Sequence, residues 1–451
     1  MSFYASALRH VIWPAYEGGL RRRDTPRHMR RYERDQWLAA DDLAALQFER
    51  LRRLIHWCHR EVPYYRRRWD ALGITPFDIR KPADIALLPV LTKADIRENF
   101  DDMKAVSLKD ALGYKATGGS TGEPLRFGFT RESNDRRVAV MWRGYGWAGS
   151  RMGRRTLFLW GGPVGEQSLS HKWKDRAYNA VFGRKLLDSF PMSESNMADY
   201  ADAIDAYRPE VIVGYVGPLV RLSEWLIATG RRVAKPASII GAAEALHPFQ
   251  RELIERAFGA PAFNTYGCRE FMLIASECEH RDGLHVNADH LIVETLGADG
   301  RPSRDGSGEV AITDLFNHGM PFIRYVNGDM ATQRARPCPC GRGLPMLASV
   351  DGRKLDAIRT PDGHILPGEF FPHMLKDVPG LTRFQLVQRQ LDRLDLSIVR
   401  GREFDDASLD YIRREVSRVL GDSAQLHCHF VDDIPLTRSG KLRVTVSELA
   451  S

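Results

Sequence analysis

A segment rich in glycine and hydroxyl side chains is the strongest chemical signal in this chain of 451 residues. Residues 116–124 read Ala-Thr-Gly-Gly-Ser-Thr-Gly-Glu-Pro. The backbone N–H groups and hydroxyls of such a loop can turn onto phosphate oxygens. No Gly-Lys-Ser/Thr follows at Walker spacing, and an ordinary glycine-rich hairpin remains the alternative. The candidate phosphate-binding residues are Thr117, Gly118, Gly119, Ser120, Thr121 and Gly122.

Three further segments carry side chains suited to nucleotide chemistry. Tyr266-Gly-Cys-Arg-Glu270 follows a predicted strand over 261–264 and offers an aromatic ring for a base and a carboxylate for Mg²⁺. Asp329, expected in a turn after a strand, could accept ribose hydroxyls, and Lys441 ends a Thr-Arg-Ser-Gly-Lys segment. Taken singly, each is more typical of an ordinary turn or a solvated loop.

Cysteine spacing indicates a metal site. Cys338 and Cys340 are one residue apart in Cys-Pro-Cys-Gly-Arg, and Cys278 and His285 lie upstream. Three thiolates and one imidazole complete a tetrahedral structural zinc site. We predict that these four residues bind zinc, with His280 as the rival fourth ligand. The alternative is a set of reduced thiols and surface histidines.

Predicted helices and strands must position these candidate residues. A helical spacing of apolar residues over 43–60 ends before Pro63, as expected at a proline. Strands alternate with helices through the middle of the chain, which predicts an α/β fold. The predicted strands are 156–160, 211–213 and 238–240, and the predicted helices are 218–229 and 248–259.

The predicted order of strands and helices changes after Gly352. Strands are predicted over 384–388, 392–399 and 425–430, with an amphipathic helix over 408–420. This ββαβ pattern indicates a separate small domain. We therefore predict domains at 1–353, with 1–42 as an N-terminal extension, and at 354–451.

Composition limits the class of protein. The formal net charge is +7, and acids and bases are interleaved except between Arg21 and Arg34. This charge is more typical of a protein that binds an anionic small molecule, or of one that needs charge for solubility, than of a nucleic-acid-binding protein. No apolar run is long enough to span a membrane, and no signal peptide is evident, so a cytoplasmic protein is predicted. A basic stretch at Arg21, Arg22 and Arg23 is expected to be solvated, with membrane-surface contact as the alternative.

The four nucleotide-type segments, in this order, resemble the adenylate-forming superfamily. The resemblance is closer to its phenylacetate–CoA ligase branch, including the capsular-polysaccharide-associated members, and it covers about residues 45–450. The phrases typical of that branch begin at Val62, Leu88, Gly241, Pro321, Cys338 and Ile434 and read VPYYR, LPVLTK, GAAE, PFIRY, CPCGR and IPLTRSGK.

The resemblance implies a fold and an activity. The fold would be a large N-terminal adenylate-forming domain of layered sheets and helices, with a small mobile C-terminal α+β lid domain. The activity would be ATP- and Mg²⁺-dependent activation of a small-molecule carboxylic acid to an acyl-adenylate, followed by acyl transfer, with coenzyme A as the expected acceptor. Amide or ester formation with another acceptor remains an alternative, as does a non-catalytic nucleotide-binding partner.

The resemblance also implies residue roles. Thr117 to Thr121 would clasp the triphosphate, and Lys441 would bridge the carboxylate and the α-phosphate. The remaining residues would surround the nucleotide and the metal: Ala243 and Glu244 (adenine and acyl pockets), Tyr266 and Gly267 (adenine), Glu270 (Mg²⁺), Asp329 (ribose) and Arg353 (near the ribose).

Three positions depart from the family pattern. Glu123 stands where a lysine is usual, Arg269 replaces a hydroxyl residue beside Glu270, and Leu355 replaces the hinge carboxylate. These departures favour adenylation over the coenzyme A step. Aromatic and apolar side chains that could line an acyl pocket, or simply belong to the core, are Trp142, Trp160, Tyr215, Val216, Phe271 and Met272.

Overall fold

The computed structural model describes residues 3–117, 125–161, 178–297, 299–303, 306–353, 358–359, 361, 365–366, 370–375, 378–420, 424–435 and 443–449. The chain divides into two units. The first contains Met1–Asn327 and Thr332–Ser349, and the second contains Gly328–Ala331 and Val350–Ser451. The main division thus falls at residue 350, close to the boundary expected at 353.

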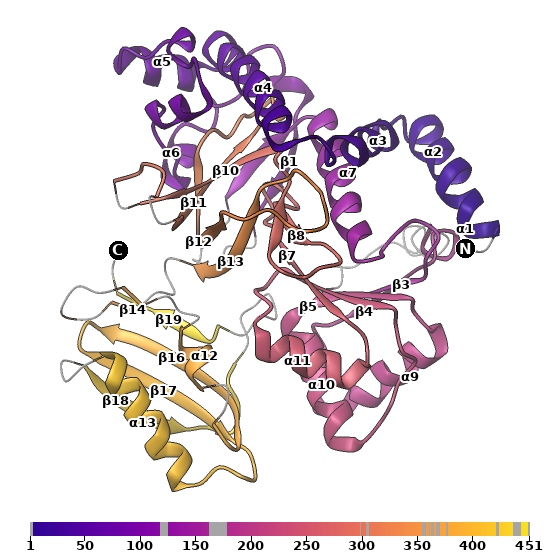
Figure 1. Cartoon of the computed structure of the whole chain (residues 1–451), viewed down its shortest axis with the longest axis vertical. Coiled ribbons are helices and arrows are strands. Elements are labelled where there is room, and N and C mark those ends of the chain that lie inside the picture. The colour runs from indigo at the N-terminus through magenta and orange to yellow at the C-terminus, as the bar shows by residue number, and fades with distance from the viewer. Residues whose placement is uncertain are drawn as a thin grey trace. The chain divides into compact units, whose positions relative to one another are not determined.

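The first unit holds most of the helices and strands (Figure 1). Its helices are α1 (Phe3–Ala7), α2 (Trp13–Ala15), α3 (Thr25–Asp35), α4 (Ala40–Glu61), α5 (Pro63–Ala71), α6 (Lys93–Glu98), α7 (Arg131–Trp147), α9 (Met197–Tyr207), α10 (Val216–Thr229) and α11 (Pro248–Phe258). Its strands, the last two of which continue into the second unit, are β1 (Gly113–Ala116), β2 (Arg126–Phe129), β3 (Thr156–Trp160), β4 (Arg184–Asp188), β5 (Val211–Tyr215), β6 (Ser238–Ala242), β7 (Ala262–Tyr266), β8 (Ala275–Glu277), β9 (Leu284–Val286), β10 (Leu291–Leu296), β11 (Ser307–Asp314), β12 (Tyr325–Arg334) and β13 (Met346–Arg353).

An eleven-stranded mixed sheet organises this unit, in the order β10-β11-β12-β13-β9-β8-β7-β6-β5-β3-β4. Strands β7, β6, β5, β3 and β4 are parallel, whereas β7, β8 and β9 pair antiparallel. The predicted strands over 156–160, 211–213 and 238–240 correspond to β3, β5 and β6. The predicted α/β class is confirmed.

Helices cover both faces of the parallel strands, which is why these strands read as continuous apolar runs. Ile212 and its equivalents on neighbouring strands pack against α9, α10 and α11. Val211 and Val213 point to the opposite face, where they pack with Tyr145 of α7. Figure 1 shows α9, α10 and α11 grouped on one side of these strands.

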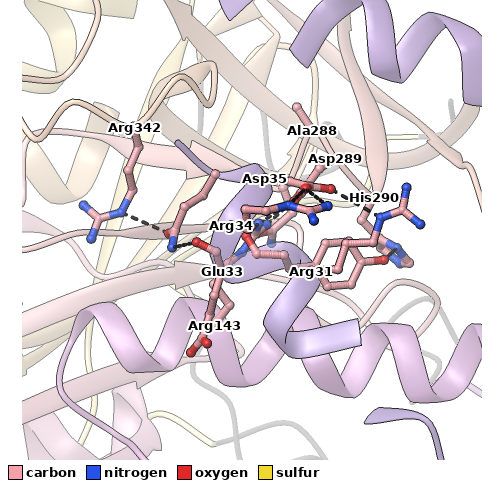
Figure 2. Close-up of polar contacts among 12 residues, drawn as sticks. Arg31, Glu33, Arg34, Asp35, Arg143, Ala288, Asp289, His290 and Arg342 are labelled. Carbon is pink, nitrogen blue, oxygen red and sulfur yellow. Dashed lines mark hydrogen bonds and ion pairs between the residues drawn. The ribbon is translucent and has the colours of Figure 1, made fainter. Parts of the chain in front are cut away.

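Helix α3 is built into the first unit, although 1–42 was expected to be an extension. Its Tyr32 is fully buried and carries a hydrogen bond to His290 Nδ1 at 2.9 Å. Arg143 of α7 donates to both carboxylate oxygens of Asp289, at 2.5 and 2.8 Å, and to the Tyr32 carbonyl at 2.9 Å. Figure 2 shows this group of polar contacts. Arg21 and Arg22 are exposed, as expected of a solvated basic stretch, and Arg23 is half-buried.

The chain after α3 lies directly against the Cys-Pro-Cys-Gly-Arg loop. Trp147 Nε1 and Arg342 Nε both donate to Gln36 Oε1, at 2.8 and 3.2 Å. A Cβ atom on Gly343 would lie 2.0 Å from the Leu38 carbonyl oxygen, so no other residue fits there without displacing the backbone. The N-terminal segment and this loop thus form one packed surface.

The second unit has its own sheet, in the order β18-β17-β16-β19, and its own core. Its elements are β14 (Ile358–Arg359), β15 (Ile365–Leu366), α12 (Phe370–Leu375), β16 (Leu381–Gln390), β17 (Arg393–Arg400), α13 (Asp406–Leu420), β18 (Gln425–Phe430) and β19 (Thr445–Ser447). Ile412 and Val416 of α13 pack on Leu386 and Leu396 of the sheet. The predicted ββαβ order is present. Of the helices described in both units, none is both long and apolar enough to cross a membrane.

Candidate active site and metal centre

The carboxyl ends of the parallel strands define one edge of the large sheet. β3 ends at Trp160, β5 at Tyr215, β6 at Ala242 and β7 at Tyr266. In open α/β sheets ligands bind beyond this edge. The rings of Trp160 and Tyr215 meet there, with their centroids 4.3 Å apart. The edge therefore gathers predicted residues from four separate parts of the chain.

The Gly241-Ala-Ala-Glu244 segment leaves β6 in an unusual backbone conformation. Ala243 has a φ of +66°, in the left-handed region that a residue with a Cβ seldom adopts. Such positions are concentrated at functional sites. Glu244 Oε2 accepts a hydrogen bond of 2.9 Å from the Gly217 backbone N–H at the start of α10. Burial raises the pKa of Tyr215, and the nearby Glu244 carboxylate raises it further.

Two buried hydrogen bonds hold the Tyr266-to-Glu270 segment. Asn327 Nδ2 donates to the Tyr266 hydroxyl at 2.8 Å, and the Tyr325 hydroxyl donates to Glu270 Oε1 at 3.0 Å. Gly267 lies so close to the Met272 carbonyl oxygen that a Cβ atom on residue 267 would be 2.0 Å from it. The turn after β7 is thus tied to β12. Tyr325 and Asn327 were not predicted as site residues, although Tyr325 ends the PFIRY phrase that begins at Pro321 and Asn327 lies two residues before Asp329.

The base of the glycine-rich loop is a hairpin. β1 and β2 pair antiparallel, and Thr117 continues the pairing. The Thr117 N–H donates to the Leu125 carbonyl at 2.9 Å, and the Leu125 N–H donates to Thr117 Oγ1 at 2.8 Å. The Thr117 side chain therefore closes the base of the loop.

Several predicted site residues are not described. Outside the described residues lie Gly118, Gly119, Ser120, Thr121, Gly122, Glu123, Leu355 and Lys441. Arg353 ends β13, and only its backbone is described. Asp329 was expected in a turn but lies inside β12, one residue after Gly328, whose φ is +86°. Asp329 belongs to the second unit.

The suggested acyl-pocket residues separate into two groups. Trp142 packs with Leu8 and Trp13 in an apolar cluster, and Phe271 is fully buried against Phe322 and Tyr325. Val216 is also fully buried. Trp160 and Tyr215, at the ends of β3 and β5, are only half-buried and remain the aromatic pair at the sheet edge.

Four potential metal ligands converge elsewhere in the first unit. One ligand atom from each of Cys278, His285, Cys338 and Cys340 lies within 4.8 Å of all the others. The Cys278 and Cys338 sulfurs are 3.7 Å apart, and Cys340 Sγ lies 3.4 Å from His285 Nε2. His280 is exposed and stands outside this group. The pairing of β9 with β8 and β13 brings His285 to the cysteines.

Burial controls the protonation of this cluster. It lowers the pKa of His285 to about 4, so the imidazole is neutral and available as a ligand. Burial raises the pKa of Cys278 to about 12. For Cys340, burial also raises the pKa, but the Arg342 backbone N–H and guanidinium bring it below the ordinary value. A bound cation would compensate the thiolate charge that burial disfavours.

Comparison with known proteins supports this architecture. A family model described as the CapK C-terminal domain matches residues 358–448. Phenylacetate-coenzyme A ligase from Escherichia coli is 28% identical over 368 residues, which cover 79% of this chain and 82% of that protein. The Thermus thermophilus ligase of the same name is 27% identical, covering 79% and 81%. Protein CapK from Staphylococcus aureus is 22% identical, covering 91% and 90%.

Solved structures give the fold class. A structure titled as 2-hydroxyisobutyryl-CoA ligase in the postadenylation state matches with a TM-score of 0.76 at 21% identity, covering 92% of each chain. An anthranilate CoA ligase matches with a TM-score of 0.55 at 16% identity, covering 73% of this chain and 64% of that one. The fold is that of the adenylate-forming enzymes. In sequence the chain is similar to phenylacetate-coenzyme A ligases and to CapK, and its C-terminal part matches the CapK C-terminal domain.

Proposed function

We propose that this protein is an ATP-dependent ligase that activates a carboxylic acid as an acyl-adenylate and transfers the acyl group to coenzyme A. The observation that carries this proposal is the set of contacts after β7, where Tyr266 pairs with Asn327 and Glu270 with Tyr325. The relatives named as phenylacetate-coenzyme A ligases support it.

The chemistry needs charge control at the α-phosphate. A carboxylate attacks the α-phosphorus, and pyrophosphate leaves, so anionic groups must approach one another. Bound Mg²⁺ neutralises phosphate charge, and we assign its protein ligand to Glu270. Tyr266, Gly267, Ala243 and Glu244 would border the adenine.

The other assigned roles lie nearer the phosphates and the ribose. Asp329 would hold the ribose hydroxyls, with Arg353 nearby. Thr117 and the loop that follows it, from Gly118 to Gly122, would bind phosphates. Lys441 would bridge the carboxylate and the α-phosphate and thereby align the two reacting groups.

Pyrophosphate release tests this proposal. Purified protein is incubated with ATP and Mg²⁺ and with a panel of aryl, fatty and hydroxy acids, each with and without coenzyme A. We expect release that requires one class of acid, and multiple turnovers only with coenzyme A. Turnover with an amine or alcohol in its place would assign a different acceptor. Nucleotide binding with no pyrophosphate from any acid would favour a non-catalytic partner.

We also propose that Cys278, His285, Cys338 and Cys340 bind a structural zinc ion. Three thiolates and one imidazole form a closed tetrahedral set, with no position open for substrate. Elemental analysis of protein purified without chelator should give about one zinc per chain, and Cys338→Ser should lower it while Cys268→Ser should not. Zinc far below this ratio in the unaltered protein would remove the assignment. The six free cysteines are compatible with a reducing cytoplasm, where ATP and coenzyme A are available.

A further inference from the structure

Lys115 stands in β1, directly before the glycine-rich segment. It faces Phe127 of β2, and its Nζ lies 4.6 Å from the centre of the Phe129 ring. Its hydrogen-bond partner is the neutral side chain of Asn134 on α7, whose Oδ1 is 2.9 Å from Nζ. Within the described residues, Lys115 forms no ion pair with a carboxylate. Among the described residues, no carboxylate therefore compensates the charge of this half-buried ammonium group.

Two arginines, Arg137 and Arg269, act electrostatically on Lys115. Arg137 lies one helical turn after Asn134, and its side chain is only 3% exposed. Its Nη2 forms an ion pair with the buried Asp314 carboxylate at 2.9 Å, whereas its Nε and Nη1 have no hydrogen-bond partner among the described residues. Arg269, exposed in the turn after β7, forms no ion pair in the part of the chain that the structure describes. Burial lowers the pKa of Lys115, and the positive charges of Arg137 and Arg269 lower it further. Like charges that repel one another in this way are stabilised when an anion binds between them.

The sequence of the loop itself adds a negative charge. Glu123 is its only charged residue between Thr117 and Leu125. By sequence, residues 118–124 thus offer a polyphosphate one carboxylate and no cationic side chain. The compensating charge has to come from side chains outside the loop.

We propose that Lys115 and Arg269 bind the β- and γ-phosphates of ATP, and then the pyrophosphate that leaves, with Arg137 as a buried positioning residue behind them. This assignment rests on the proposed function and names two binding residues for it. Lys115 comes from the hairpin and Arg269 from the turn that carries Glu270. The two cations would therefore draw the metal-binding turn and the hairpin toward the same polyphosphate.

Equilibrium binding to the full-length protein tests the assignment. We compare Lys115→Met and Arg269→Gln with Lys109→Met, an exposed lysine six residues earlier whose loss changes the net charge equally. The probes are ATP with Mg²⁺, inorganic pyrophosphate and AMP. Lys115→Met and Arg269→Gln should each weaken ATP and pyrophosphate on the order of 10-fold, as expected when one charge-assisted hydrogen bond is lost, and leave AMP within about twofold. Lys109→Met should change none of the three.

Two further variants separate charge from folding. Lys115→Arg keeps the charge and should retain pyrophosphate affinity, whereas a purely structural role at Asn134 predicts that AMP and pyrophosphate weaken together in Lys115→Met. Adding Glu123→Lys to Lys115→Met should restore ATP affinity. An unchanged ratio of ATP to AMP affinity in both Lys115→Met and Arg269→Gln would overturn the assignment.

The outcome for the unaltered protein distinguishes this inference from the proposed function. Pyrophosphate binding that depends on Lys115, without adenylation of any acid, would keep the anion site and remove the ligase activity. Adenylation with no effect of Lys115→Met or Arg269→Gln would do the reverse. Failure of the unaltered protein to bind either ATP or pyrophosphate would remove both.

Discussion

At the scale of single residues, the site depends on side chains whose positions are set by buried neighbours. Glu270 is only 5% exposed, and its carboxylate is oriented by the Tyr325 hydroxyl. The residue types that could bind a nucleotide were evident from the sequence. Tyr325 and Asn327 were missed because their roles depend on β12 lying beside the turn after β7, which local sequence does not specify.

Replacing Glu270 tests the proposed metal ligand. Glu270→Gln keeps the shape of the side chain and its acceptor oxygen but removes the charge that a magnesium ion prefers. We expect the rate of ATP–pyrophosphate exchange to fall about 100-fold and the Mg²⁺ concentration for half-maximal rate to rise. Glu98→Gln, at an exposed position of α6, is the charge-matched control. An unchanged Mg²⁺ dependence in Glu270→Gln would contradict the role.

His290 predicts how stability depends on pH. Its side chain is fully buried, and burial lowers its pKa to about 3. The unfolded chain binds a proton at about pH 6.5 and the folded chain does not, so this contribution is complete above pH 6.5 and declines as the pH falls toward 3. Between pH 6.5 and 5 the loss is about 2 kcal/mol.

The measurement is denaturant unfolding at pH 7 and pH 5. We expect His290→Gln to show a smaller pH-dependent decrease than the unaltered protein, whereas the exposed His10→Gln should show the same decrease. Equal pH dependence in all three proteins would mean that the native state accommodates a protonated His290.

At the scale of elements, helices and strands marked by local sequence signals were predicted, whereas burial that depends on contacts distant in sequence was not. The strands β3, β5 and β6 and the helix α11 were predictable because an apolar run, a proline at the first turn and Gly259 after the last turn are local signals. Helix α3 was not predictable as a core element. Its arginine-rich sequence is typical of a solvated helix, and the buried partners of Tyr32 lie 111 and 258 residues away in the sequence.

The ion pair between Arg143 of α7 and Asp289 should be essential for stability. Arg143 and Asp289 are both buried, and removing the arginine leaves a carboxylate without a partner in the interior. We expect Arg143→Met to destabilise the first unit by about 3–5 kcal/mol, measured by denaturant unfolding. Arg53→Met, which removes an arginine exposed on α4, should cost less than about 1 kcal/mol. Similar losses in the two variants would show that Asp289 is rescued by other groups, such as Asn287.

At the scale of the whole molecule, the chain divides into two units. Glu270 and Tyr266 belong to the first unit, whereas Asp329 belongs to the second. The two-part organisation was predictable because the ββαβ pattern after Gly352 differs from the α/β alternation before it. The contribution of residues 328–331 to the second unit was not, since they lie within one long strand of the first sheet.

A shortened chain should separate nucleotide binding from chemistry. A protein ending at Ser349 keeps Thr117, Glu244, Tyr266 and Glu270 but lacks Lys441. We expect it to bind ATP within about 10-fold of the full-length affinity and to lose at least about 100-fold in pyrophosphate exchange. Lys441→Ala in the full chain should reproduce the loss of exchange. Undiminished exchange in the shortened protein would place the activating cation in the first unit.

The docking of α3 also has a consequence for synthesis of the protein. Tyr32 pairs with a residue 258 positions later, and Gln36 with one 306 positions later. At about 5–20 residues per second, a ribosome delivers these partners roughly 15–60 s after the helix emerges. During most of translation, the amino-terminal segment that contains Tyr32 therefore lacks the residues against which it packs in the folded protein. Nascent chains halted before Asp289 should leave this segment open to proteases, and chains extended past Arg342 should protect it.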